Sequence, residues 1–146
     1  MAHSIAVVYL HLVFSTKDRQ PLIVSTWQND LYSYLGGILK HLHSQPIIIN
    51  GTMDHIHILC TLPREIDIAS FLRNLKASSS KWVHQYHNPH FAWQEGYGAF
   101  SVGLSNLEQV KGYIRNQEKH HDKQGFMEEF NSMLRAFGLM PYCETH

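Results

Sequence analysis

The segment at residues 52–63, TMDHIHILCTLP, alternates bulky apolar residues with polar ones, and this constrains the fold more than any other feature. A period of two is typical of a strand with one buried face, because successive side chains point to opposite sides. Ile56 and Ile58 would then share the face that packs against helices. His55 and His57 would share the other face, where two neutral imidazoles at this spacing can hold one divalent cation.

Histidine spacing alone does not establish a metal site here, because 12 of the 146 residues are histidines. Further groups of histidines occur at 41 and 43, at 84, 87 and 90, and at 120 and 121. The group at 84–90 begins on a predicted helix that Asn88-Pro89 ends, so we do not expect it to converge on one ion. On spacing alone, His55 and His57 could also be solvated residues on an exposed sheet face.

The charge balance, the cysteine count and the N-terminal residues argue against a strongly basic, a disulfide-rich or a membrane protein. The formal net charge is zero, so any nucleic-acid surface must be local. Two distant cysteines, Cys60 and Cys143, form neither a C-x-x-C zinc motif nor a disulfide framework, which favours the cytoplasm. The apolar N-terminus lacks the basic region and cleavage site of a signal peptide and is too short to span a membrane, so no membrane partner is expected. The length predicts one domain over residues 1–146.

The predicted elements follow the order β, α, β, β, α, β, with further helices after them. Strands are expected at about 7–16, 47–50, 52–63 and 91–103, and the first two helices at about 25–41 and 67–86. Asn50-Gly51 predicts a tight hairpin between the second and third strands. This order predicts an α+β protein of the ferredoxin-like (split βαββαβ) class, with an antiparallel sheet covered by helices on one face.

A third helix could complete a site on the open face of that sheet. Ser105 and Glu108 form a capping box that predicts a helix from Asn106 to about His121. Tyr113 and Gln117 on this helix are four residues apart, about 40° around its axis, beside an apolar stripe. A tyrosine at such a position is also commonly a core residue with a solvated hydroxyl. Residues 122–146 carry apolar side chains at helical spacing and predict a final short helix.

Three segments together resemble one family. They are DHIHIL at 54–59, GYGAFSV at 96–102 and YIRNQEKHH at 113–121. The chain from about Val7 to His121 closely resembles the single-tyrosine HUH transposases of small bacterial and archaeal insertion sequences, the IS200-like type, and the related repeat-associated tyrosine transposases. The resemblance selects His55 and His57 from the surplus of histidines, and it implies a tyrosine carried by a helix added after the ferredoxin-like core.

The resemblance also implies a mechanism. His55, His57 and Gln117 would hold Mg²⁺ or Mn²⁺, and because all three ligands are neutral the ion would keep its full charge for the scissile phosphate. Tyr113 would attack single-stranded DNA to give a covalent 5′-phosphotyrosine and a free 3′-OH, and a second strand end would then displace the tyrosine. Such DNA transposition and recombination needs no ATP. The sequence does not identify the group that deprotonates Tyr113.

The implied partners are single-stranded DNA, commonly folded as imperfect hairpins at the element ends, and a second copy of the chain. A homodimer is expected because each chain has one nucleophile and an element has two ends. The sequence does not settle whether Tyr113 serves its own chain or the partner. Local cations that suit phosphate contacts are Arg73, Lys76, Lys111 and Arg115. The protein would act in the cytoplasm, at the nucleoid.

Other functions remain open from the sequence. Ferredoxin-like sheets also occur in non-catalytic nucleic-acid-binding modules, although the aromatic RNA-binding motifs of such modules are missing here. A metal-dependent phosphodiesterase could use activated water in place of Tyr113, although the chain shows no acidic cluster suited to two metals. A host protein descended from a transposase would share the transposase chemistry. Covalent attachment to DNA would distinguish the transposase from the first two alternatives.

Overall fold

The computed structural model describes residues 3–117 and 125–140. Its sheet has four antiparallel strands in the order β2-β3-β1-β4. The strands are β1 (Tyr9–Ser15), β2 (Pro46–Gly51), β3 (His55–Thr61) and β4 (Gly98–Val102). This is the strand order of the ferredoxin-like plan, so the predicted fold class is confirmed.

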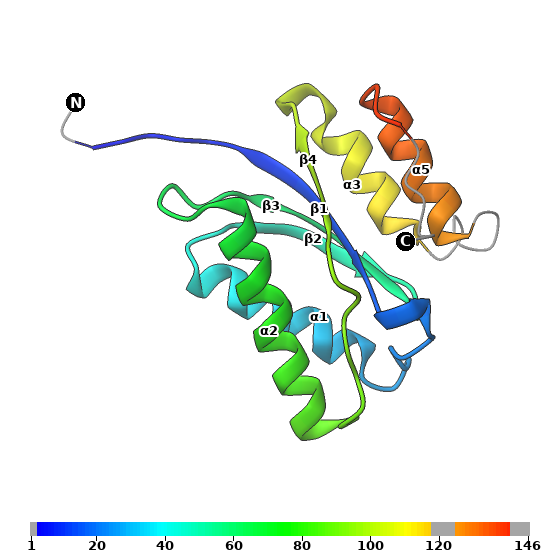
Figure 1. Ribbon diagram of the computed structural model, residues 1–146. Coiled ribbons are helices and arrows are strands. Elements are labelled where there is room, and N and C mark those ends of the chain that lie inside the picture. Colours follow the sequence, from blue (N-terminus) through cyan, green and yellow to red (C-terminus); the bar gives the residue numbers. More distant parts are fainter. Residues whose placement is uncertain (1–2, 118–124, 141–146) are drawn as a thin grey trace.

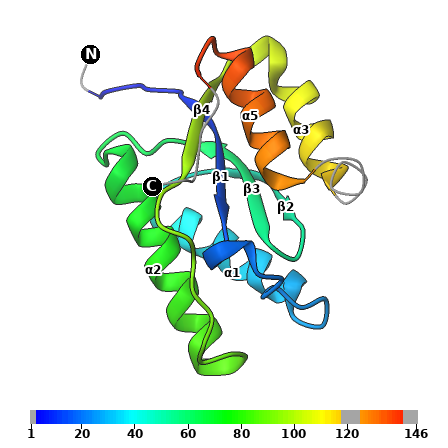
Figure 2. The same ribbon diagram turned by 45° about the vertical axis from the view of Figure 1, so that its right-hand side comes forward.

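Helices cover both faces of the sheet, so the molecule has three layers (Figures 1 and 2). Helices α1 (Gln28–His41) and α2 (Ile68–Tyr86) lie on one face, and α3 (Leu107–Arg115) and α5 (Phe126–Ala136) lie on the other. Tyr113 lies on α3, which is an added helix as expected, but α5 follows it in the chain. Among the described residues, no helix is both long enough and apolar enough to cross a membrane.

The main core lies between the sheet and helices α1 and α2. Strands β1 and β3 contribute alternating residues to it: Leu10, Leu12, Phe14, Ile56, Ile58 and Cys60. Fully burying one such side chain stabilises the fold by roughly 1.5–3 kcal/mol. A slip of one residue in β3 would turn His55 and His57 into this core, so the register of the histidine strand is strongly specified.

The starts of α2 and α3 differ in how they are capped, and the one capping prediction, at Ser105 and Glu108, was wrong. Helix α2 begins after Asp67, whose carboxylate accepts a hydrogen bond of 2.8 Å from the backbone N–H of Ser70. The capping box at Ser105 and Glu108 does not form. Instead the chain leaves β4 through a short 3₁₀ helix, η2 (Leu104–Asn106), and α3 begins at Leu107 without a side-chain cap.

The last strand is shorter than predicted, because only residues 98–102 of the expected 91–103 pair with β1. Residues 91–97 form an irregular segment with one isolated backbone bridge, between Trp93 and Thr16 just after β1, and the Trp93 ring packs against Phe14 of β1. The ammonium group of Lys76 on α2 holds this segment by donating hydrogen bonds to the carbonyls of Gln94 (2.7 Å) and Gly96 (2.8 Å). These two carbonyls therefore accept hydrogen bonds from a helix side chain, in place of the backbone hydrogen bonds to β1 that the predicted strand would make.

Candidate active site

His55 and His57 lie side by side on the face of β3 that points away from the main core. Their ring centroids are 5.1 Å apart, and both side chains are fully buried. The alternative that they decorate a solvated sheet face is therefore wrong, because helices α3 and α5 lie across that face (Figure 2).

Helix α3 brings the other two predicted residues to the same place. The side-chain amide of Asn50 on β2 donates to the carbonyls of Ile114 (2.9 Å) and Arg115 (3.1 Å), and this fixes the end of the helix against the sheet. The Tyr113 ring then meets His57 edge-on, with 5.7 Å between centroids. Buried Gln117 follows the helix and places its Oε1 3.1 Å from His55 Nε2. The tyrosine thus meets the histidines of its own chain.

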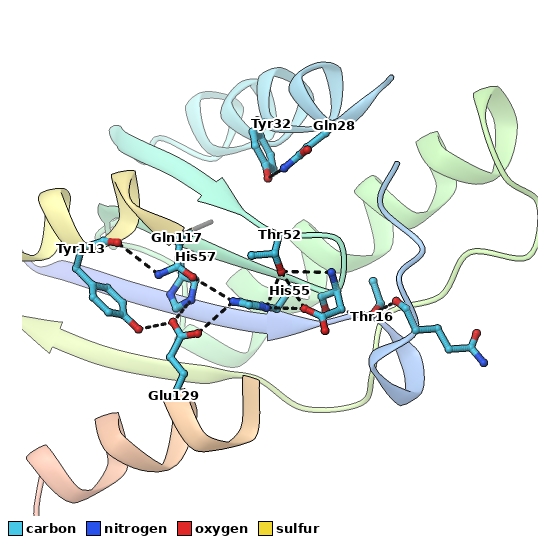
Figure 3. Close-up of polar contacts among 11 residues, drawn as sticks. Thr16, Gln28, Tyr32, Thr52, His55, His57, Tyr113, Gln117 and Glu129 are labelled. Carbon is cyan, nitrogen blue, oxygen red and sulfur yellow. Dashed lines mark hydrogen bonds and ion pairs between the residues drawn. The ribbon is translucent and has the colours of Figure 1, made fainter. Parts of the chain in front are cut away.

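Glu129 on α5 is the residue that the sequence analysis missed. Its carboxylate is 2 % exposed and lies at the centre of the site, with Oε1 3.0 Å from His57 Nε2 and Oε2 3.5 Å from His55 Nε2 (Figure 3). The Tyr113 hydroxyl donates a hydrogen bond to Oε1. The only indication of Glu129 in the sequence was its position in the predicted final helix, three residues after Phe126 and at the edge of that helix's apolar stripe.

The electrostatics of the site couple these groups. Burial by itself lowers the pKa of His55, but its contacts with the carboxylates of Asp54 and Glu129 outweigh burial and raise this pKa to about 9. Burial by itself raises the pKa of Glu129, but its contacts with His55 and His57 hold that pKa far below its usual range. Burial and the adjacent Glu129 carboxylate raise the pKa of Tyr113. At neutral pH Glu129 is therefore ionised and Tyr113 is a neutral phenol that donates to it.

The residues present fit a divalent metal ion. Ligand atoms of His55, His57 and Glu129 lie within 4.8 Å of one another, and no other group of three such ligands converges in the described parts of the chain. Glu129 Oε2 has no hydrogen-bond partner among the described residues, which suits a metal ligand. With Gln117 Oε1, the set has two imidazole nitrogens and two oxygens, a mixture suited to Mn²⁺ and acceptable to Mg²⁺. A ligand set that includes Glu129 would carry one negative charge, whereas the ligands that the resemblance implies, His55, His57 and Gln117, are all neutral.

The predicted DNA-contacting cations fall into two groups. Lys111 and Arg115 lie on α3 beside Tyr113. Arg73 and Lys76 lie on α2, on the opposite side of the sheet, and the structure does not bring them to the site.

The remaining histidines have other surroundings. His84 contacts the carbonyl of Phe91, and the His87 ring stacks on Trp27 with 4.9 Å between centroids. His84 therefore links α2 to the segment that follows it, and His87 links the end of α2 to the Trp27 ring before α1. His120 and His121 lie outside the described residues.

Comparison with known proteins places this site in a family. Two curated transposases for insertion sequence element IS200, from Salmonella typhimurium and Salmonella typhi, are each 27% identical over 133 residues, which is 86% of both chains. Among solved structures, a candidate transposase from Deinococcus radiodurans R1 has a TM-score of 0.64 at 22% identity, covering 78% of this chain and 93% of that one.

A second solved structure is a REP-associated tyrosine transposase bound to a REP hairpin. It has a TM-score of 0.58 at 15% identity, covering 86% of this chain and 73% of that one. These structural likenesses support the fold. The sequence profile described as "Transposase IS200 like" matches residues 4–117, which include His55, His57, Tyr113 and Gln117. The resemblance seen in the sequence is therefore confirmed, and the chain belongs to the family of IS200-like transposases.

Proposed function

We propose that this protein cleaves and rejoins single-stranded DNA at element ends, in a metal-dependent reaction that passes through a covalent 5′-phosphotyrosine on Tyr113. Family membership makes the chain a DNA transposase, and thus an enzyme that cleaves and joins DNA. The observation that carries the finer proposal is the position of the Tyr113 hydroxyl, which contacts a carboxylate that also contacts both histidines.

In the proposed step, the oxygen of Tyr113 forms a bond to phosphorus while the bond from phosphorus to the 3′ oxygen breaks. The products are a phosphotyrosine ester and a free 3′-OH. The phenolic proton needs an acceptor, because an unperturbed tyrosine has a pKa near 10. Glu129 Oε1 accepts the hydrogen bond from this hydroxyl and so orients the phenol, but with its pKa held far below the usual range it is too weak a base to keep the proton, which would pass through solvent to the departing 3′ oxygen. The 3′-OH of a second strand then attacks the phosphorus, the bond from phosphorus to the Tyr113 oxygen breaks, and the proton lost by that 3′-OH passes through solvent to the tyrosine.

His55, His57, Gln117 and Glu129 would hold Mg²⁺ or Mn²⁺. Such an ion, when bound, polarises the scissile phosphate and stabilises the charge that develops on it. The chain's own contribution is to keep the ligands buried and fixed, since helices α3 and α5 exclude water from His55 and His57. Because two of the ligands are imidazoles, we expect Mn²⁺ to bind more tightly than Mg²⁺.

The proposed DNA partner is a single strand folded into a hairpin near the cleavage point, by analogy with the REP-associated transposase bound to its hairpin. Lys111 and Arg115 are the proposed phosphate contacts, because they share α3 with Tyr113. Arg73 and Lys76 could reach only DNA that extends to the α2 side of the sheet. A homodimer of two sites, each with its own tyrosine, would process both element ends, and we place this activity in the cytoplasm at the nucleoid.

A covalent-adduct assay tests the proposal. Purified protein is incubated with Mn²⁺ or Mg²⁺ and a labelled single-stranded oligonucleotide from the DNA that flanks the gene, and the products are separated on a denaturing gel. We expect a metal-dependent protein–DNA adduct that Tyr113→Phe abolishes and that Tyr97→Phe, at a half-exposed tyrosine outside the site, retains. Cleavage without an adduct would instead identify a phosphodiesterase that uses water, and binding without cleavage would identify a non-catalytic module.

A further inference from the structure

We propose that His11 is a positioning residue that orients His57 for metal binding, an inference that rests on the proposed metal site. His11 lies on β1, beside β3, and its side chain is only 6 % exposed. Val13, two residues along the same strand, pairs with His57, so His11 and His57 occupy the same face of the sheet. His11 Nε2 lies 2.7 Å from His57 Nδ1, which is a short hydrogen bond between two buried rings.

The direction of this hydrogen bond follows from the chemistry of imidazole. A histidine binds a metal ion through a nitrogen that carries no proton, and its other nitrogen then carries the proton. His57 Nε2 faces Glu129 and the ligands around it, so Nε2 is the metal-binding atom and Nδ1 is the N–H donor. His11 Nε2 must then be the acceptor.

His55 is oriented in the same way by a different group. Its Nδ1 lies 2.7 Å from Asp54 Oδ1 and 3.0 Å from Thr52 Oγ1, which leaves Nε2 facing Gln117 and Glu129. Both histidines are therefore held at Nδ1 and present Nε2 to one point. Outer partners of this kind fix the tautomer and the ring angle of a metal-binding histidine.

The partner of His57 is a neutral imidazole, whereas the partner of His55 is a carboxylate, and this difference affects the charge of the site. Asp54 and Glu129 already bring two carboxylates to a site that must also receive a DNA phosphate. A third carboxylate at position 11 would repel that phosphate, whereas an imidazole accepts the hydrogen bond without adding charge. His11 thus orients the ligand and keeps the electrostatics favourable for an anionic substrate.

A packing role is the alternative to be excluded. The His11 ring lies 6.2 Å from both the Phe100 and the Tyr113 ring centroids, and it lines a cavity of about 500 Å³ between α3, α5 and β4. His11→Phe keeps a flat ring of similar size in this setting but removes the acceptor. His11→Gln changes the shape but keeps an acceptor oxygen within reach of Nδ1. The pair therefore separates packing from hydrogen bonding.

The experiment measures the Mn²⁺ dissociation constant of each variant by electron paramagnetic resonance of the free ion, and thermal unfolding in EDTA. We expect His11→Phe to weaken Mn²⁺ binding about 10- to 100-fold while the metal-free protein stays folded, and His11→Gln to recover most of that loss. His90→Phe, at an exposed histidine after α2, is the matched control and should bind Mn²⁺ like the unmodified chain.

The outcomes separate this inference from the proposed function. If the unmodified chain binds Mn²⁺ and His11→Phe binds it equally well, His11 does not position His57. If His11→Phe fails to fold, His11→Gln decides: affinity close to that of the unmodified chain supports the inference, and a 10-fold or greater loss overturns it. If the unmodified chain itself binds no Mn²⁺, the proposed metal site is wrong, and the positioning role of His11, which depends on that site, is wrong as well.

Discussion

Raising the pH from 6.5 to 9 should destabilise the metal-free protein. The pKa of His55 is raised from its ordinary 6.5 to about 9 by Asp54 and Glu129, despite the opposing effect of burial. A group whose pKa is higher in the folded state contributes stability that is complete below pH 6.5 and is lost as the pH rises through 9. A shift of 2.5 pH units at 1.36 kcal/mol each corresponds to about 3 kcal/mol. We expect the melting temperature to fall by roughly 10 °C over this range.

The acid side of the profile should fall as well. The pKa of His11 is lowered to about 3, so its contribution to stability is complete above pH 6.5 and is lost as the pH falls toward 3. The lowered pKa of Glu129 adds a further loss below about pH 4.5. The metal-free protein should therefore be most stable near pH 6.5. Burial raises the pKa of Cys60 to about 12, and this adds a separate destabilisation only above pH 9.

Urea denaturation in EDTA at pH 5, 6.5, 8 and 9 measures this profile. Glu129→Gln removes one of the two carboxylates that raise the pKa of His55, so the decrease between pH 6.5 and 9 should become smaller. Glu128→Gln is the matched control, because the neighbouring side chain is exposed, and it should leave the profile unchanged. A free energy of unfolding that stays constant or increases between pH 6.5 and 9 in the unmodified chain would refute the assigned charge coupling.

Two further predictions concern metal binding and the turn before the histidine strand. Mn²⁺ affinity should increase about tenfold from pH 7 to pH 8, because the ion must displace a proton from His55, whose pKa is about 9. Calorimetric titration with Mn²⁺ at both pH values tests this prediction, and equal affinities would contradict it. Gly51→Ala should lower the free energy of unfolding by several kcal/mol in urea denaturation, because a Cβ there would lie 2.2 Å from the His55 carbonyl oxygen. The control is Gly37→Ala in α1, where nothing lies within 4 Å of the added Cβ, and it should raise the free energy of unfolding by about 0.5–1 kcal/mol. Equal stabilities of the two variants would show that the turn at Gly51 tolerates a side chain.

Local sequence patterns predicted the parts of the site that depend on short-range geometry. The alternation of apolar and polar residues around His55 and His57 predicted that both side chains lie on one face of the sheet. This holds whatever packs against the strand, because successive side chains of a strand always point to opposite faces. The four-residue spacing of Tyr113 and Gln117 likewise placed them one helical turn apart. The sheet order followed from the sequence of element types, because few topologies satisfy it.

The contacts that complete the site depend on long-range docking and could not be read locally. Glu129 reaches the histidines only because α5 packs across β4, where the Phe130 ring occupies the space that a Cβ on Gly98 would need. His11 meets His57 only through the β1–β3 register, and a single histidine in an apolar strand gives no sign of that pairing. The failed capping box at Ser105 has a similar cause, since the path out of β4 forms a 3₁₀ turn there.

The most direct test is to locate the DNA attachment site by mass spectrometry. Protein–DNA adduct formed with Mn²⁺ is trimmed with nuclease, digested with protease, and searched for peptides that carry a nucleotide through a 5′ phosphate. The predicted result is a single modified peptide with the phosphate on Tyr113, formed only when the metal is present and absent from Glu129→Gln and His57→Ala at equal protein and DNA concentrations. Attachment at another residue, such as the half-exposed Tyr97, or cleaved DNA with no modified peptide, would contradict the assignment of Tyr113 as the nucleophile.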